Sequence, residues 1–164
     1  MKILLILRHA KSSRDDPALN DHDRPLNDRG LKTAPLMGRL LKREGLVPDA
    51  IFSSIALRAI HTAELVARAC GFSKKIRKVE RFYPGDPVDY IETLRSSDKM
   101  LKTIMVVGHN PGLEELLYNL TKEREQLPTA ALAHLELALE QWNDLSSKTE
   151  AVLIKVYRPK EIFK

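Results

Sequence analysis

Residues 3–9 read ILLILRH: five aliphatic side chains in a row, followed by an arginine and a histidine. An uninterrupted aliphatic run of this length is typical of a parallel strand that is buried on both faces of a sheet. Five apolar residues, ended by Arg8, are too few for the core of a signal peptide or for a membrane span. We therefore expect a central strand over 3–7, with Arg8 and His9 at its carboxyl end.

Strand-like and helix-like patterns alternate along the rest of the chain. The polar stretch 12–24 indicates a loop after the first strand. Short apolar runs predict further strands over 49–53, 77–82, 103–107, 131–139 and 151–157. Apolar residues at helical spacing predict helices between Asn27 and Gly45 and over 57–70, 88–94 and 113–120. This alternation predicts an α/β domain with a mainly parallel sheet.

Single residues mark the expected helix ends. Asn27 is a good N-cap, because its side-chain oxygen can accept a hydrogen bond from a free N–H group of the first turn. Gly71 is placed to end the second helix in a left-handed conformation. Pro35 falls inside the first helix, where we expect it to cause a kink.

The composition is that of an ordinary globular protein, and 164 residues fit a single domain that spans 1–164. Lysine and arginine number 27 against 22 acidic residues, a formal net charge of +5 that favours anionic ligands. Aromatic residues make up only 5% of the chain, which argues against nucleic-acid binding through stacked bases.

The lone Cys70 cannot form an intramolecular disulfide, so a reducing compartment is expected. We find no export signal and no membrane span in the sequence, and we expect a cytoplasmic protein that does not bind membranes. The oligomeric state stays open.

Polar side chains follow three of the expected strands. Arg8 and His9 follow the first, Ser53 and Ser54 with the nearby Arg58 follow the second, and His109 and Asn110 follow the strand over 103–107. Ligands of open α/β sheets bind beyond the carboxyl ends of the strands. The sequence therefore predicts that these groups meet at one edge of the sheet.

These residue types suit phosphoryl chemistry. Planar guanidinium groups such as those of Arg8 and Arg58 can bind phosphoryl oxygens bidentately. Neutral imidazole can attack phosphorus without a separate base, so His9 is a candidate nucleophile, and His109 can donate hydrogen bonds to the equatorial oxygens. A carboxylic acid would protonate the leaving group and later activate water, and Glu80 is the first candidate.

We expect neither a metal nor another cofactor. The sequence contains no HExxH motif and no paired carboxylates at metal-ligand spacing. The two arginines already make the expected pocket cationic.

Four segments, in order, resemble the histidine phosphatase superfamily, which includes the phosphoglycerate mutases, and in particular its SixA-like phosphohistidine phosphatase branch. Residues 7–12 (LRHAKS) resemble the RHG-type nucleophile motif, with Ala10 in place of its glycine. Residues 24–30 (RPLNDRG) are similar to an RPLTxxG segment in which Asn27 replaces a threonine. Residues 53–63 (SSIALRAIHTA) and 108–111 (GHNP) resemble the segments that carry the second arginine and the second histidine.

The resemblance covers nearly the whole chain and implies a fold and a set of site residues. The implied fold is a three-layer α/β/α sandwich like that of phosphoglycerate mutase, without a large cap insertion, because the segment between Phe82 and Lys102 has room for one helix. The implied phosphate-binding residues are Arg8, Ser12, Arg58, His109 and Asn110. Residues 80–83 (ERFY) resemble the mutases' acid segment, although SixA-like members can lack a proton donor there.

The leading interpretation is a metal-independent phosphatase that forms a covalent phosphohistidine on His9. Its substrate would be phosphohistidine on a protein, or a related phosphorylated group. A phosphatase of small esters and a mutase-like phosphotransferase are the enzymatic alternatives, and a non-catalytic module that binds phosphoproteins is the alternative from another class. Asp86 competes with Glu80 for the role of proton donor.

Overall fold

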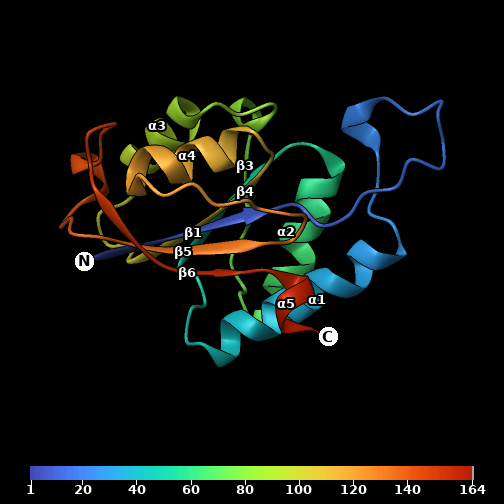
Figure 1. The fold of residues 1–164 in the computed structure, drawn as a ribbon, viewed down its shortest axis with the longest axis horizontal. Coiled ribbons are helices and arrows are strands. Elements are labelled where there is room, and N and C mark those ends of the chain that lie inside the picture. Colours follow the sequence, from blue (N-terminus) through green and yellow to red (C-terminus); the bar gives the residue numbers. More distant parts are fainter. Residues whose placement is uncertain (164) are drawn as a thin grey trace.

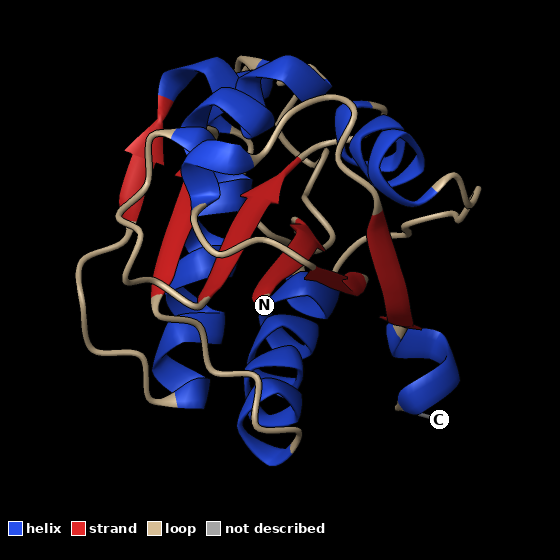
Figure 2. Ribbon diagram, turned by 90° about the vertical axis from the view of Figure 1, so that its left-hand side faces the viewer, coloured by secondary structure: helices blue, strands red, loops and turns tan. Residues whose placement is uncertain are grey.

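The computed structural model describes residues 1–163, in which helices cover both faces of a central sheet (Figures 1 and 2). The six strands are β1 (Lys2–Arg8), β2 (Ala50–Ser54), β3 (Arg77–Val79), β4 (Thr103–Gly108), β5 (Leu132–Leu137) and β6 (Ala151–Tyr157). Their order across the sheet is β3-β2-β4-β1-β5-β6. Among the described strands, only β5 runs against the others, so the sheet is mainly parallel, as predicted.

The helices form the two outer layers. They are α1 (Asp28–Arg43), α2 (Leu57–Cys70), α3 (Pro87–Arg95), α4 (Gly112–Thr121) and α5 (Pro159–Ile162), with short 3-10 helices η1 (Asp21–Asp23), η2 (Glu80–Phe82) and η3 (Trp142–Asp144). Figure 1 shows α3 and α4 above the sheet and α1 and α5 below it. Helix α2 packs against α1 and shares its hydrophobic cluster. The three-layer α/β/α sandwich is therefore confirmed.

The aliphatic side chains of β1 pack alternately into two hydrophobic clusters, one on each face of the sheet. Leu4 and Ile6 belong to the hydrophobic cluster on the side of α3 and α4, and Leu5 and Leu7 to the cluster on the side of α1 and α2. All four side chains are fully buried. Because both faces of the sheet are covered, the strand has no wet face and its sequence shows no polar alternation.

The pairing of β1 with β4 places the two histidines side by side. These strands are parallel and in register from Ile3 opposite Thr103 to Arg8 opposite Gly108. His9 and His109 therefore leave the sheet at equivalent positions, and the N–H group of His9 donates to the carbonyl of Gly108 at 3.1 Å.

The helix ends agree with the predicted caps. Asn27 precedes α1, and its Oδ1 accepts a hydrogen bond from the N–H of Gly30 at 2.9 Å. Gly71 ends α2 with a φ of 83°, in the left-handed region. Pro35 lies inside α1.

Two strands are shorter than predicted because their partners end. β3 stops at Val79, which pairs with Ser54, the last residue of β2, and residues 80–82 turn into η2 instead. β5 stops at Leu137, which pairs with Lys2, the first residue of β1. The short helix α5 was not predicted.

The edge of the sheet that carries the histidines has no large insertion over it. In the described structure, the segment between η2 and β4 forms one helix of nine residues, α3, as the length of that segment predicts. None of the helices within residues 1–163 is both long enough and apolar enough to cross a membrane.

Gly108 ends β4 against a buried aromatic ring. A Cβ atom at this position would overlap the hydroxyl of Tyr90, whose side chain is fully buried. That hydroxyl also accepts a long hydrogen bond, 3.5 Å, from the N–H of His109. The absence of a side chain at Gly108 thus lets α3 pack against the strand end that positions His109.

We predict that Gly108→Ala lowers the free energy of unfolding by about 1–3 kcal/mol, since the extra methyl group overpacks a closed core. Urea denaturation followed by circular dichroism measures the effect. In the double variant Gly108→Ala/Tyr90→Phe, the removal of the hydroxyl should restore part of the loss. An unchanged urea midpoint in the single variant would contradict the packing described.

Candidate active site

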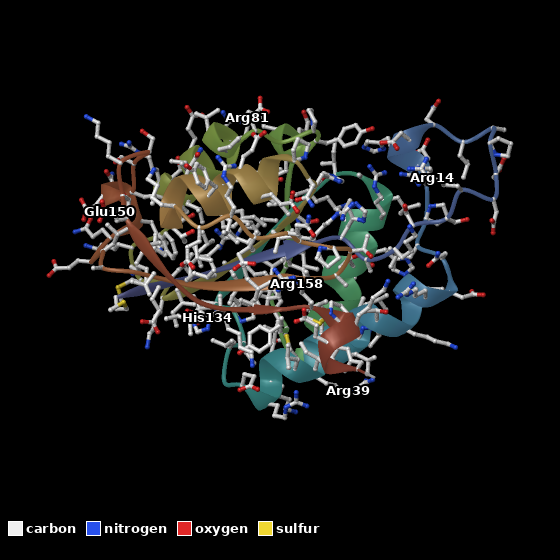
Figure 3. All side chains as sticks on the ribbon, in the orientation of Figure 1. Arg14, Arg39, Arg81, His134, Glu150 and Arg158 are labelled. Carbon is white, nitrogen blue, oxygen red and sulfur yellow. The ribbon has the colours of Figure 1, made fainter. Side chains whose placement is uncertain are left out.

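A pocket of about 420 Å³ opens at the carboxyl edge of the sheet. Cations, imidazoles, hydroxyls and amides line it: Arg8, His9, Lys11, Ser12, Arg14, Arg24, Asn27, Arg58, His109, Asn110 and Thr129. Figure 3 shows Arg14 on the loop after β1, at the end of the molecule opposite Glu150. The pocket brings together six of the seven residues predicted from the sequence as catalytic or phosphate-binding, Glu80 being the exception.

His9 presents one free ring nitrogen. Its side chain is 7% exposed, and Nδ1 lies 2.7 Å from the carbonyl oxygen of Ala10. A carbonyl oxygen can only accept, so Nδ1 carries the proton and Nε2 keeps its lone pair. The N–H of Ala10 in turn donates to the hydroxyl of Thr62 at 2.9 Å, which ties this loop to α2. This tautomer leaves Nε2 as the ring nitrogen with a lone pair available to an electrophile.

His109 lies beside His9, with ring centroids 5.2 Å apart. Its Nε2 is 2.8 Å from the hydroxyl oxygen of Ser54, a fully buried side chain at the end of β2. The ring of Tyr83 meets the His109 ring edge-on at 5.6 Å. Three segments distant in sequence therefore fix the orientation of this imidazole.

Both imidazoles are kept neutral. Burial lowers the pKa of His9 to about 3, and electrostatic effects of His109, Arg58 and Arg8 act in the same direction, against the hydrogen bond to Ala10. Burial, together with Arg58 and Arg8, lowers the pKa of His109 to about 4, with Asp21 opposing. A neutral imidazole is the form that can attack an electrophile.

The two arginines are held in different ways. Arg8 donates from Nη1 to the carbonyl oxygen of Leu127 at 3.1 Å. Arg58 donates from Nη1 to the carbonyl of Asp21 at 2.7 Å and from Nη2 to its Oδ2 at 3.0 Å. The Nε atoms of both arginines are buried without a hydrogen-bond partner among the described residues. Both guanidinium groups thus line the pocket with donor capacity to spare.

Asp21 is a site residue that the sequence did not single out. Its carboxylate accepts hydrogen bonds from the hydroxyl of Tyr83 at 2.8 Å, from Arg58, and from Arg24 Nε at 3.1 Å. The hydrogen bond from Tyr83 is the largest cause that holds the pKa of Asp21 well below its usual range; burial, the next largest, opposes it, and the hydrogen bonds from Arg58 and Arg24 add to the lowering. The carboxylate is therefore ionised at neutral pH.

Arg24 and Tyr83 are further residues at the site whose roles the sequence did not predict. Arg24 donates from Nη1 to the hydroxyl of Ser12 at 2.8 Å, which orients that pocket serine. The sequence held a signal for both, because Arg24 opens the segment 24–30 and Tyr83 ends the segment 80–83. Asp21 lies in a loop without any pattern of its own.

The two carboxylates predicted as proton donors lie outside the residues that line the pocket. Glu80 is exposed at the start of η2. Asp86 caps α3, where its side chain accepts from the backbone of Asp89 in a capping box. A proton-donor role for either residue stays a prediction.

The described residues contain no group of three or more histidine, cysteine, aspartate or glutamate side chains that could hold a metal ion. The charges that face the pocket come from arginine and lysine side chains instead.

Comparisons with known proteins agree with this geometry. The model of the histidine phosphatase superfamily (branch 1) matches residues 4–83. An uncharacterized protein of Mycobacterium tuberculosis is 33% identical over 158 residues, which are 90% of this chain and 96% of that protein.

Solved structures share the whole fold. A candidate phosphohistidine phosphatase SixA from Agrobacterium tumefaciens superposes with a TM-score of 0.82 at 27% identity, over 96% of this chain and 98% of that one. The protein histidine phosphatase SixA in complex with tungstate superposes with a TM-score of 0.84 at 21% identity, over 98% of this chain and 99% of that one, a likeness of fold.

We predict that the imidazoles of His9 and His109 stay neutral from pH 8 down to about 5, because burial disfavours their charged forms. An anion such as vanadate should raise both pKa values, since a negative charge favours imidazolium. Titration of the Hε1 resonances by NMR, assigned with His9→Gln and His109→Gln, measures this. An apparent pKa near 6.5 for either ring in the free protein would contradict its burial.

Proposed function

The chain belongs to the histidine phosphatase superfamily, and we propose that it is a phosphohydrolase that passes through a phosphohistidine on His9. The observation that carries the proposal is the hydrogen bond from His9 Nδ1 to Ala10. It leaves the Nε2 lone pair free in a pocket that also contains Arg8, Arg58 and His109. A free imidazole nitrogen and groups that can bind an anion thus lie in the same pocket, which supports the proposal.

The reaction has two steps. In the first, His9 Nε2 forms a bond to phosphorus while the bond from phosphorus to the leaving group breaks, and the leaving group gains a proton from solvent water. In the second, water attacks the phosphohistidine, the bond from phosphorus to Nε2 breaks, the attacking water gives one proton back to solvent, and inorganic phosphate departs from neutral His9. Arg8, Arg58 and His109 stabilise the charge on the equatorial oxygens in both steps.

We infer that the substrate carries an easily displaced leaving group. Asp21, the carboxylate bound to Arg58, is held ionised and is therefore a poor proton donor at neutral pH. A phosphate ester leaves as an alkoxide and depends strongly on protonation, whereas the imidazole of a phosphohistidine needs little help from an acid. This favours phosphohistidine over an ester.

The open edge of the sheet supports a protein substrate. One helix, α3, occupies the segment that separates η2 from β4, so the pocket mouth can admit a side chain carried by another protein. A small phosphorylated molecule is the second candidate, because the volume of about 420 Å³ lies within the range of small-molecule sites.

We propose further that turnover needs no metal, because two guanidinium groups supply the positive charge that a metal would otherwise provide. Treatment with EDTA should leave the rate unchanged.

We predict that His9→Ala abolishes turnover, since the atom that forms the covalent intermediate is lost. Phosphate release should be measured with phosphohistidine protein, phosphoramidate and simple phosphate esters, and the acid-labile phosphoenzyme should be trapped. His61→Ala, on α2 and outside the pocket, is the matched control and should retain activity. Full activity of His9→Ala would refute the nucleophile, and binding of the phosphoprotein without turnover would favour the binding module.

We predict that Arg58→Ala lowers kcat by about 10²–10³-fold, the loss found when a donor to the transition state is removed. Arg39→Ala is the control, because Arg39 is an exposed arginine on α1 (Figure 3). Steady-state kinetics on the best substrate of the panel measures both variants. A change in KM alone would mean that Arg58 binds the ground state and the transition state equally.

A further inference from the structure

The backbone of Leu127 joins two pocket side chains to a carboxylate outside the pocket. Its carbonyl oxygen accepts hydrogen bonds from Arg8 Nη1 at 3.1 Å and from Asn110 Nδ2 at 2.9 Å. Its N–H group donates to Glu114 Oε2 at 2.7 Å. Leu127 is 1% exposed, and the three hydrogen bonds that its backbone makes are partly buried.

We propose that Glu114 is a positioning residue, which holds Arg8 and Asn110 in their working orientation through the backbone of Leu127. The proposal rests on the proposed function, in which Arg8 binds the phosphoryl group. Glu114 itself does not line the phosphate pocket. It lines a neighbouring cavity of about 800 Å³, together with Glu115, so it acts through Leu127 and not on the substrate.

The chain on either side of Leu127 makes this connection stiff. Glu114 lies in the first turn of α4, which begins two residues after Asn110, so only a short stretch of backbone separates the carboxylate from the amide. Leu127 precedes Pro128, and a residue before proline is largely restricted to extended conformations. Holding its N–H group therefore also constrains where its carbonyl points.

The negative charge of Glu114 also supports Arg8, in addition to the hydrogen bond through Leu127. Burial lowers the pKa of Arg8, Glu114 opposes that effect, and Arg58 adds to it. The carboxylate of Glu114 thus stabilises the positive charge of Arg8, which the nearby guanidinium of Arg58 disfavours. Hydrogen bond and charge can be separated by substitution, because glutamine keeps the acceptor and loses the charge, whereas aspartate keeps the charge and is too short to reach.

We predict that Glu114→Asp and Glu114→Ala lower kcat/KM by about ten- to a hundredfold, as expected when a small displacement moves a binding group. Glu114→Gln should stay within about threefold of the wild type, because its amide oxygen can still accept from Leu127. Glu115→Ala is the matched control, one residue further along the same helix and exposed. If Glu114→Gln is as impaired as Glu114→Asp, or if Glu114→Asp is fully active, the proposal is wrong.

A double-mutant cycle with Arg8→Ala separates positioning from a general loss of structure. If Glu114 acts through Arg8, adding Glu114→Ala to Arg8→Ala should cost little more, and the two effects should be far from additive. Additive losses would overturn the proposal. Should the Ala variants fail to fold in thermal melts, the comparison of Gln with Asp still decides.

Vanadate binding by calorimetry supplies a readout that does not depend on turnover. Glu114→Asp should weaken it in parallel with Arg8→Ala, and Glu114→Gln should not. If the wild type hydrolyses none of the substrates but Glu114→Asp still binds vanadate more weakly than Glu114→Gln, the proposed function is refuted and the positioning role of Glu114 is not. An active wild type with unchanged vanadate binding in Glu114→Asp would refute only the positioning role.

Discussion

The parallel ladder between β1 and β4 is the constraint on which the rest of the site depends. It sets Arg8 opposite Gly108, and the residue that follows each strand is a histidine, so the two imidazoles lie next to each other with centroids 5.2 Å apart. Both strands are buried on two faces, and a slip of one residue would turn every core side chain to the wrong layer. Packing of the hydrophobic core therefore fixes the relative position of the two histidines.

Much of the fold could be predicted because its elements carry local signals. α2 and β6 begin and end at the predicted residues, since Gly71 ends the helix and a polar segment precedes the strand. β3 and β5 were predicted too long, because a strand ends where its partner ends, and that partner is distant in the sequence. The rule that parallel strands present ligand-binding groups at their carboxyl ends then brought the arginines and histidines together.

The rest of the site could not be predicted because it consists of contacts without periodicity. Asp21 and Tyr83 are separated by 62 positions, and they meet only where the loop of residues 12–24 packs against α2. The carbonyl of Leu127 reaches Arg8 across 119 positions, and a backbone oxygen has no signature in the sequence. Glu80, by contrast, had a motif in its favour, yet it is exposed on η2 and is not among the residues that line the pocket.

Asp21 has a consequence for the release of an anion from the pocket. Its backbone carbonyl already accepts from Nη1 of Arg58 and its carboxylate from Nη2. An anion that enters the pocket must share the guanidinium of Arg58 with Asp21. When the anion leaves, Asp21 is still hydrogen-bonded to Arg58. This competition weakens the binding of every oxyanion to Arg58. In the proposed reaction it therefore works against inhibition by the product, inorganic phosphate.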